Sequence, residues 1–407
     1  MSKSHTKLLY RDAILSTIFV FLCIALFALN PFNIKPFNII GGSLKDIEFT
    51  DILFSGKNPG RGDYQTKISN DIVLVNSADR GRAEIAFLLN KINAENPAVV
   101  GVDFIFEGPK DKQDDSLLRS AFLNTNKLVL ATKFKNDDEA ERPTYLTTAS
   151  VLGTYTQGYA NLMVKSMDKT VRYFRTKDAM DGKTIYPFSL EVVRAFDSTK
   201  SREFIQRNRD FELINYEGNL DATHHINGSD ILSGNYPDNF LKNKIVLIGF
   251  FGSDCNPNPV LDDYFYTPMN DKIFGRKFPD TYGVVIQANI IAMMLQQKYI
   301  SKTPAWVDWA IGFLVCFLHN LLFIRLFVHS HLFYHFYAKL IQLGTTFLLV
   351  LACIYLFKEM HIKISASPFI VPVLLTVDLL YFYDAIVQWL HKKKITKTYF
   401  TTGPMHH

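Results

Sequence analysis

Four long apolar runs are the feature that most constrains this chain of 407 residues. They extend from Ala13 to Leu29, Trp306 to Ile324, Tyr337 to Phe357 and Pro368 to Leu390. Each is close to the roughly 20 residues that a helix needs to cross a bilayer core of about 30 Å. A segment in lipid must satisfy its own backbone hydrogen bonds, so membrane helices are predicted. The alternative, long helices in a soluble core, is disfavoured by the charged and aromatic residues at the ends of the runs.

Basic residues beside these runs predict the orientation of the chain. They precede the first run, follow the last one and bracket the connection between the second and third: Lys3, Lys7, Arg11, Arg325, Lys339, Lys392, Lys393, Lys394 and Lys397. The positive-inside rule therefore places both termini and that connection in the cytoplasm. The net charge of +5 reflects these flanks, which would lie against anionic lipid headgroups, and does not indicate a nucleic-acid partner.

The domain boundaries follow from the runs and their flanks. We predict a cytoplasmic tail at 1–12, membrane helices at 13–30, 303–327, 337–357 and 368–390, a domain outside the cytoplasm at 31–302 and a cytoplasmic tail at 391–407. The first helix is predicted to be an uncleaved anchor, with a cleaved signal peptide as the alternative. Three of the four cysteines fall in the predicted helices and only Cys255 lies outside, so no disulfide framework is expected there.

The outer domain is predicted to be α/β. Continuous apolar runs at 72–75, 99–102 and 128–131 indicate buried strands, and helical spacing of apolar residues separates them at 82–92 and 117–122. This alternation predicts βαβ units and a mostly parallel sheet. The second half adds predicted elements less regularly: helices at 189–196, 229–234 and 284–295, strands at 211–216 and 244–249.

Several blocks of this region, in this order, resemble the type-two CHASE domain, an extracytoplasmic sensory module of bacterial receptors. They lie at 71–75, 82–89, 97–106, 115–121, 158–161 with Asp168 and Arg172, 244–249 with Asp262, and 283–289. Three membrane helices after the domain also match the usual layout of the family. The sequence departs from the family at 78–81, where a Trp-rich turn is shortened, and at Asn76, where an acidic residue is common. An output domain usually follows the last helix in the family. Only residues 392–407 follow it here, so we expect signalling through a separate partner.

Acidic residues after two of the predicted strands are the main candidates for a ligand site. Asp79 and Asp103 follow parallel strands at the carboxyl edge of the sheet, where open α/β sheets bind ligands. With Arg82, Arg172 and Asp262 they form the candidate ligand-binding set. The two carboxylates could bind a cation or a basic ligand, or share a proton. The structural alternative is helix capping or a salt bridge to Arg82 or Arg172. Asp263, beside Asp262, could join the same rim.

Three polar residues stand out in the predicted membrane helices. Asp378 lies near the middle of the last helix, where a carboxylate is costly and usually faces a polar partner. We expect no basic partner for it within this chain, so it is predicted to face a partner subunit or a second copy. Asp384 and His319 lie at similar depth, and a hydrogen bond between them is predicted, as a static clamp.

Other tempting patterns give no catalytic or metal site. The adjacent His224 and His225 point apart in a strand and have no further Cys or His pair, so zinc is not predicted. The glycine-containing segment 249–253 lacks the phosphate-loop pattern and is predicted to be a tight turn. No nucleophile-elbow pattern accompanies the Ser, His and Asp residues. We therefore expect no catalytic residue, no metal and no cofactor.

The sequence favours a sensory or regulatory receptor subunit of a bacterial inner membrane. It would bind a ligand or a protein outside and act on another membrane or signalling protein through its membrane helices, and self-association is a further option. An assembly subunit of an envelope complex is the alternative, and an extracytoplasmic metal-dependent enzyme is a third. A cavity with convergent polar groups would favour the receptor, and a flat apolar patch on the outer domain would favour the assembly subunit.

Overall fold

The computed structural model describes residues 3–28, 49–55, 68–135, 144–163, 169–180, 182–253, 263–270, 278–329 and 333–401. The chain divides into two compact units. Residues 46–300 form an α/β unit, and residues 1–45 together with 301–407 form a helical unit.

The α/β unit is built on a seven-stranded sheet. Its strand order is β10, β1, β11, β2, β3 and β4, and β5 also pairs with β3. The strands are β1 Ile72–Asn76, β2 Val99–Val102, β3 Leu128–Lys135, β4 Thr144–Leu146, β5 Thr156–Tyr159, β10 His224–Asn227 and β11 Ile245–Gly249. Every residue of β1, β2 and β11 is buried, which explains why these strands are continuous apolar runs.

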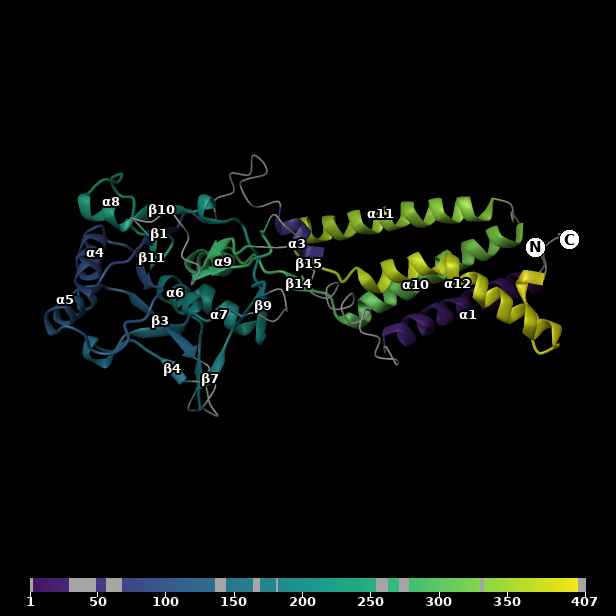
Figure 1. The fold of residues 1–407 in the computed structure, drawn as a ribbon, viewed down its shortest axis with the longest axis horizontal. Coiled ribbons are helices and arrows are strands. Elements are labelled where there is room, and N and C mark those ends of the chain that lie inside the picture. Colours follow the sequence, from purple (N-terminus) through teal and green to yellow (C-terminus); the bar gives the residue numbers. More distant parts are fainter. Residues whose placement is uncertain are drawn as a thin grey trace. The chain divides into compact units, whose positions relative to one another are not determined.

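Helices cover both faces of this sheet (Figure 1). On one face α4 (Arg82–Ala94), α5 (Lys112–Leu123) and α8 (Gly228–Ser233) pack against a core that includes Val73, Val100 and Val246. On the other face lie α6 (Phe188–Phe196) and α9 (Gly283–Gln296), with α7 (Ser198–Gln206) beside them. Gly101 of β2 allows the close approach of α6, because a Cβ there would lie 2.9 Å from Phe188 Cζ.

The prediction of a mostly parallel sheet needs correction, because the strand pairing of the α/β unit is mixed. Among its described residues five strand pairs are parallel and four are antiparallel. Apart from β3, the antiparallel strands have two or three residues each: β4, β6 (Tyr173–Arg175), β7 (Asp178–Met180), β8 (Lys183–Ile185), β9 (Phe211–Leu213), β12 (Tyr264–Phe265) and β13 (Thr281–Tyr282). Strands this short, with polar residues, lack the apolar run that identified the buried strands.

The longer predicted elements of this unit are confirmed. The strands expected at 72–75, 99–102 and 244–249 are β1, β2 and β11, and they pair in parallel. The helices expected at 82–92 and 284–295 are α4 and α9. The strand expected at 211–216 is shorter, because β9 ends at Leu213 and pairs only with β6.

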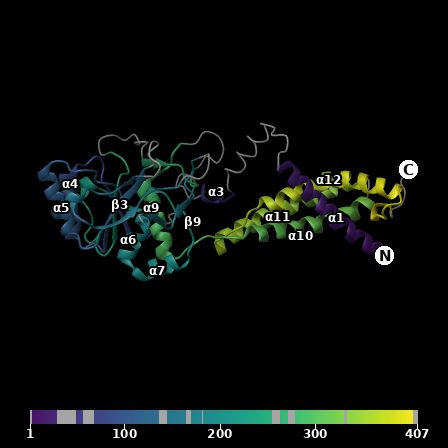
Figure 2. The same ribbon diagram turned by 90° about the horizontal axis from the view of Figure 1, so that it is seen from below.

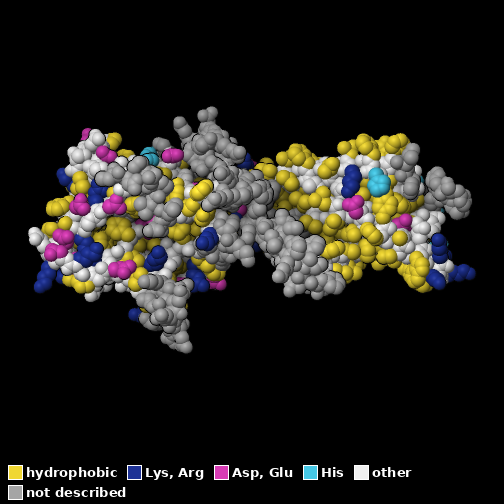
Figure 3. Space-filling view, in the orientation of Figure 1, with side chains coloured by type: hydrophobic (Ala, Val, Ile, Leu, Met, Phe, Trp, Pro, Cys, Tyr) yellow, Lys and Arg dark blue, Asp and Glu magenta, His cyan; other side chains and the backbone are white. Residues whose placement is uncertain are grey.

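The helical unit contains four helices that are long and apolar enough to cross a membrane. They are α1 (Lys3–Ala28), α10 (Ala305–His329), α11 (Tyr334–Met360) and α12 (Ser367–Lys392). The four run alongside one another in both ribbon views (Figures 1 and 2). Hydrophobic side chains dominate the face of these helices that Figure 3 shows. The predicted arrangement of one N-terminal and three C-terminal apolar helices is confirmed.

Small and polar side chains join the helices of this unit. Gly312 of α10 lies so close to α12 that a Cβ there would be 2.1 Å from the carbonyl oxygen of Pro368. Asn320 Nδ2 of α10 donates to Thr17 Oγ1 of α1 at 3.1 Å. Gln342 Nε2 of α11 donates to the Leu374 carbonyl of α12 at 2.8 Å. Small contact residues and interhelical hydrogen bonds of this kind are typical of membrane bundles.

Candidate functional site

A cavity of about 460 Å³ lies at the carboxyl ends of the central parallel strands. The residues that line it come directly after β2, β5 and β11, from the middle of β3, from β12 and the residue before it, and from the start of α9. Its lining includes Asp103, Lys133, Asn161, Phe250, Asp263 and Gln287. Open α/β sheets bind ligands at this edge, and small-molecule sites typically measure about 300–1,000 Å³. Position and size therefore make this cavity the candidate functional site.

The alternation of side chains along the strands explains why charged residues meet there. Val100 and Val102 of β2 point into the core beneath α4 and α5. Successive side chains of a strand point to opposite faces, so Gly101 and Asp103 face α6 and α9 instead. The same alternation places Lys133 of β3 on that face, because Leu128 and Leu130 belong to the opposite core. The hydrogen bond from Asp103 N to Ile248 O, at 2.8 Å, fixes the position of the acid at the end of β2.

Two of the carboxylates in the cavity, those of Asp103 and Asp263, have raised pKa values. Burial raises the pKa of Asp103 well above its usual range, the nearby charge of Asp263 raises it further, and Lys133 opposes both effects. Burial likewise raises the pKa of Asp263 to about 6, again against the charge of Lys133. Among the residues that the structure describes, neither carboxylate takes part in a salt bridge. Partly buried acids with such pKa values are typical of functional sites.

The start of α9 forms one wall of the cavity. Gly283, the first residue of this helix, lies so close to Asp263 that a Cβ there would be 2.9 Å from Oδ1. A glycine therefore lets the carboxylate approach the helix end, where the helix dipole favours negative charge. Gln287, one turn further along, is 3 % exposed and donates through Nε2 to the Ala160 carbonyl at 3.2 Å. Its Oε1 is buried and has no hydrogen-bond partner among the described residues.

The candidate residues near β1 have structural partners. Asp79 is exposed and accepts a hydrogen bond from Ser253 Oγ at 2.7 Å. Arg82 is buried, pairs with Asp115 and donates to the carbonyl oxygens of Glu107 and Gly108. Neither Asp79 nor Arg82 lines the cavity. A salt bridge from Arg82 to Asp79 or Asp103 was the structural alternative. Arg82 instead forms its salt bridge with Asp115.

Asn76, at the end of β1, joins the loops on this side of the sheet edge. Its Nδ2 donates to Asn227 Oδ1 and to the Gly252 carbonyl, and its Oδ1 accepts from Ala78 N and Phe251 N. The side-chain amide of Asn76 therefore acts as both donor and acceptor. The segment 249–253 is thereby held against the end of β1, which supports its interpretation as a structural turn.

The last two candidates of the outer set do not contribute to the described cavity. Arg172 is buried and forms a double hydrogen bond with Asp51 of α3 (Phe49–Phe54), from Nε at 3.0 Å and Nη2 at 2.6 Å. Asp262 lies outside the described residues, and its neighbour Asp263 is the acid found on the rim. The predicted set of five thus contributes Asp103 alone to the lining that the structure describes.

The polar residues of the membrane helices have partners other than the predicted ones. Lys339 Nζ of α11 lies 3.3 Å from Asp378 Oδ2, so the expectation that Asp378 lacks a basic partner in this chain is wrong. His319 Nδ1 bonds to the Val315 carbonyl at 2.8 Å, and its Nε2 has no hydrogen-bond partner among the described residues. Asp384 accepts from Gln388 on its own helix. The predicted bond between His319 and Asp384 is therefore not formed.

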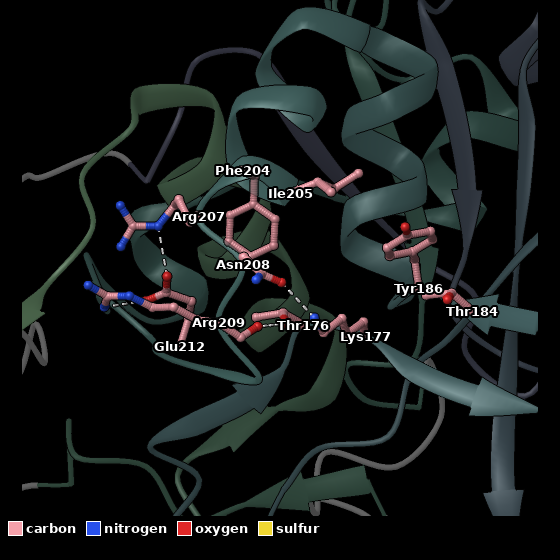
Figure 4. A pocket seen from close by; sticks show the side chains of 10 residues that line it. All are labelled: Thr176, Lys177, Thr184, Tyr186, Phe204, Ile205, Arg207, Asn208, Arg209 and Glu212. Atoms are coloured by element: carbon pink, nitrogen blue, oxygen red, sulfur yellow. Dashed lines mark hydrogen bonds and ion pairs between the residues drawn. The ribbon is translucent and has the colours of Figure 1, made fainter.

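A second, smaller cavity of the α/β unit, about 230 Å³, carries basic residues (Figure 4). Figure 4 shows Arg207 and Arg209 both directed at Glu212, and Lys177 at Asn208. Arg207 also stacks over the ring of Tyr299, 4.0 Å from its centroid. Because Glu212 already receives both guanidinium groups, this cluster has the features of a structural ion pair network.

A metal site finds no support in the geometry. No group of three or more His, Cys, Asp or Glu side chains among the described residues is arranged to hold a metal ion. His224 Nε2 forms a hydrogen bond with Asn70 Oδ1, and His225 Nδ1 forms one with the Thr223 carbonyl. The two histidines thus serve the edge strand β10 and do not converge.

Lys133 and Gln287 line the cavity and were not named as candidates from the sequence, whereas Asp263 was named as a possible member of this rim. Lys133 comes two residues after the apolar run at 128–131, within β3, so the face of the sheet to which it belongs could have been inferred from strand alternation. Gln287 and Asn289 are polar residues within an otherwise apolar helix, which is a usable signal for buried polar contacts. Their partners could not be inferred, because Ala160 and Gly218 lie 127 and 71 residues away in the chain.

One comparison with known proteins gives a match. The CHASE2 domain family matches residues 69–323, which is more than half of the chain. No curated protein and no solved structure matches the chain. The matched region covers the central sheet, the cavity and the helices on both faces. CHASE2 domains are extracytoplasmic sensory domains, and four helices able to cross a membrane accompany this one. The chain is a membrane protein that belongs to the CHASE2 domain family.

Proposed function

We propose that this chain is a receptor subunit that binds a small molecule in the cavity at the sheet edge and passes the bound state through its membrane helices to a partner protein. The observation that carries the proposal is the convergence of Asp103, Asp263 and Lys133 in one cavity at the carboxyl ends of the strands. Convergent polar groups in a partly apolar pocket are the usual form of a small-molecule site.

The covalent path from the cavity to the membrane supports a signalling role. Gly283 and Gln287 of α9 line the cavity, and α9 ends at Gln296. The short strand β14 (Ser301–Lys302) follows, and then α10 begins at Ala305. A ligand that moves or orders the start of α9 would therefore act on a helix that is joined to a membrane helix by only a short segment containing β14. Such a change biases an equilibrium only if the ligand binds the two states with different affinity.

The test is a ligand screen on the full chain in detergent, read as the midpoint of thermal unfolding. A small molecule that binds the native cavity should raise the midpoint of the wild type. The same molecule should raise the midpoint less, or not at all, in Asp103→Asn. A ligand that stabilises both proteins equally would place the binding site elsewhere and contradict the proposal.

We propose the topology as predicted, with both termini in the cytoplasm, in a bacterial inner membrane. The basic flanks of the four helices support it. A cysteine introduced at the exposed Lys242 of the α/β unit should react with a membrane-impermeant reagent in intact cells, whereas a reporter after residue 407 should be active inside. Labelling of the C-terminus from outside would refute this orientation.

The alternative, an assembly subunit of an envelope complex, is supported by two exposed apolar side chains on neighbouring helices. Phe87 of α4 is 55 % exposed and Leu123 of α5 is 68 % exposed. Replacing both with serine should reduce co-purification of an envelope partner if this function is correct, while Asp103→Asn should not. The opposite pattern favours the receptor.

A further inference from the structure

The lining of the cavity carries an excess of negative charge. Three acids line it, Asp103, Glu107 and Asp263, together with one base, Lys133. Asp103 and Asp263 are half-buried, whereas Lys133 is exposed to solvent. Among the described residues no salt bridge neutralises either half-buried acid. Two carboxylates in a partly dry site are a costly arrangement unless a positive group joins them.

Two buried side-chain amides on α9, those of Asn289 and Gln287, differ in how many of their hydrogen bonds are made. Asn289 is fully buried and uses its whole amide: Nδ2 donates to Gly218 O at 3.0 Å, and Oδ1 accepts from Glu217 N at 2.8 Å. Gln287 faces the Ala160 carbonyl, which can only accept, so the amide nitrogen must lie on that side. Its Oε1 therefore remains as an acceptor without a donor among the described residues, in a side chain that lines the cavity. A buried acceptor left without a donor is expensive, and a bound group with N–H donors would satisfy it.

Aromatic side chains complete the lining. Phe104, Phe250 and Phe265 all border the cavity. A cation gains from the face of an aromatic ring, and the carbon skeleton of an organic ligand packs against it. A bare metal ion needs several oxygen ligands at short distance, and no such group of side chains is present among the described residues.

We propose that the cavity binds a small organic ammonium ion, a primary amine, whose N–H groups donate to the carboxylates of Asp103 and Asp263 and to Gln287 Oε1. This inference rests on the proposed receptor function and specifies its ligand class. Lys133 then acts against binding, because its positive charge lies in the same cavity and repels an entering ammonium ion.

Three four-carbon probes that differ in charge test this proposal: n-butylamine, butyrate and n-butanol. Each is titrated by calorimetry into the full chain in detergent at pH 7.5, with tetramethylammonium as a cation without N–H donors. Butylamine should bind most tightly, and tetramethylammonium more weakly. Asp103→Asn should weaken butylamine binding about tenfold or more, since a hydrogen bond to a charged group is lost.

Further variants separate charge, hydrogen bonding and folding. Gln287→Met keeps the size of the side chain, removes the acceptor and should weaken butylamine binding by a few fold. Lys133→Met should strengthen it, because a competing positive charge is removed. Asp238→Asn is the matched control: Asp238 is an exposed acid of the same unit outside the cavity lining, and this variant should bind as the wild type does. Near-UV circular dichroism checks that each variant is folded.

Each other outcome overturns a defined part of the account. Butyrate binding that is lost in Lys133→Met would show an anion site and refute the amine, while the receptor function would stand. Calcium binding that is lost in Asp103→Asn would likewise replace the amine by a metal ion. If a larger fragment set of amines, carboxylates and alcohols contains no molecule whose binding depends on Asp103, the proposed receptor function fails and the amine proposal with it.

Discussion

The charged residues of the α/β unit occupy two different surroundings. Arg82 and Arg172 are buried, and each meets a carboxylate of the same unit, Asp115 and Asp51. The half-buried acids of the cavity, Asp103 and Asp263, have no such partner among the described residues. The comparison shows that a charge near a strand end is not by itself a ligand site. A charge that has a built-in counter-ion supports the fold, and one that lacks it remains available to a ligand.

The largest change in stability is expected when a buried arginine with a built-in counter-ion is replaced. Arg172→Met should lower the free energy of unfolding of the α/β unit by about 3–5 kcal/mol, because it leaves the buried Asp51 carboxylate without its counter-ion. Chemical denaturation of the full chain in detergent, followed by far-UV circular dichroism, measures this free energy of unfolding. A double variant with Asp51→Leu should recover part of the loss. A change below about 1 kcal/mol would show that Arg172 is not structural.

The two amides of α9 provide a sharper version of the same comparison. Asn289→Leu removes hydrogen bonds to Gly218 O, Val285 O and Glu217 N, and should cost about 2–3 kcal/mol of unfolding free energy. Gln287→Met removes only the bond to Ala160 O and should cost about 1 kcal/mol or less. Equal losses in the two variants would mean that Gln287 is as fully used by the fold as Asn289 is.

A pH titration of the empty protein tests the cavity side. The folded-state pKa of Asp263 is raised to about 6, so the folded protein holds a proton that the unfolded chain releases near pH 4. Stability from this group is present below pH 4 and is lost as the pH rises through about 6. The Asp263→Asn side chain stays neutral at every pH. The free energy of unfolding of this variant should exceed that of the wild type by about 1–2 kcal/mol at pH 7, with little difference at pH 4.

The charged groups that line the cavity together with Asp263 are Asp103, Glu107 and Lys133. Of these, Lys133 lowers the pKa of Asp263 and so opposes the effect of burial. Asp238→Asn, at an exposed acid, serves as the control and should leave the pH profile unchanged. A profile that is the same in Asp263→Asn and the wild type would show that this carboxylate is solvated like an ordinary surface acid.

The smallest effect is expected in the membrane helices. Because Asp378 pairs with Lys339 inside the chain, the helical unit can neutralise it without a partner. Asp378→Leu should lower bundle stability by about 1 kcal/mol or less and leave co-purifying proteins unchanged. Lys339→Leu, which leaves the acid alone, should cost more than the double variant. Loss of a partner in Asp378→Leu alone would restore a role for Asp378 in partner contact.

The sequence predicted the parts of the molecule that local pattern determines. Apolar runs identified β1, β2 and β11 and the four long helices, and the position after β2 identified Asp103. The partners of Arg82 and Arg172 could not be predicted, because Asp115 and Asp51 lie 33 and 121 residues away in the chain. Hydrophobic pattern cannot pair such distant charges. For the same reason the presence of Gln287 of α9 and Lys133 of β3 in one cavity could not be predicted.

The short antiparallel strands were missed for a different reason. β7 and β8 have three residues each, all exposed or half-exposed, so no periodic apolar signal marks them. In the helical unit Asp12 was not singled out. It is fully buried and accepts from Thr398 Oγ1 and Tyr399 N, both at 2.7 Å. A charged residue at the flank of a membrane helix is expected to face solvent. The structure instead shows that residues after α12 cover Asp12.

Hydrogen–deuterium exchange on the full chain in lipid nanodiscs, with and without saturating n-butylamine, tests the central claim most directly. The account predicts protection at the end of β2, around Asp103, and at the start of α9, around Gln287, together with altered exchange in the first turns of α10. Asp103→Asn should abolish all three changes. Protection confined to the basic cavity around Arg207 and Glu212, or none at the sheet edge in the presence of a bound ligand, would contradict the claim that this receptor senses through the cavity at the carboxyl ends of its strands.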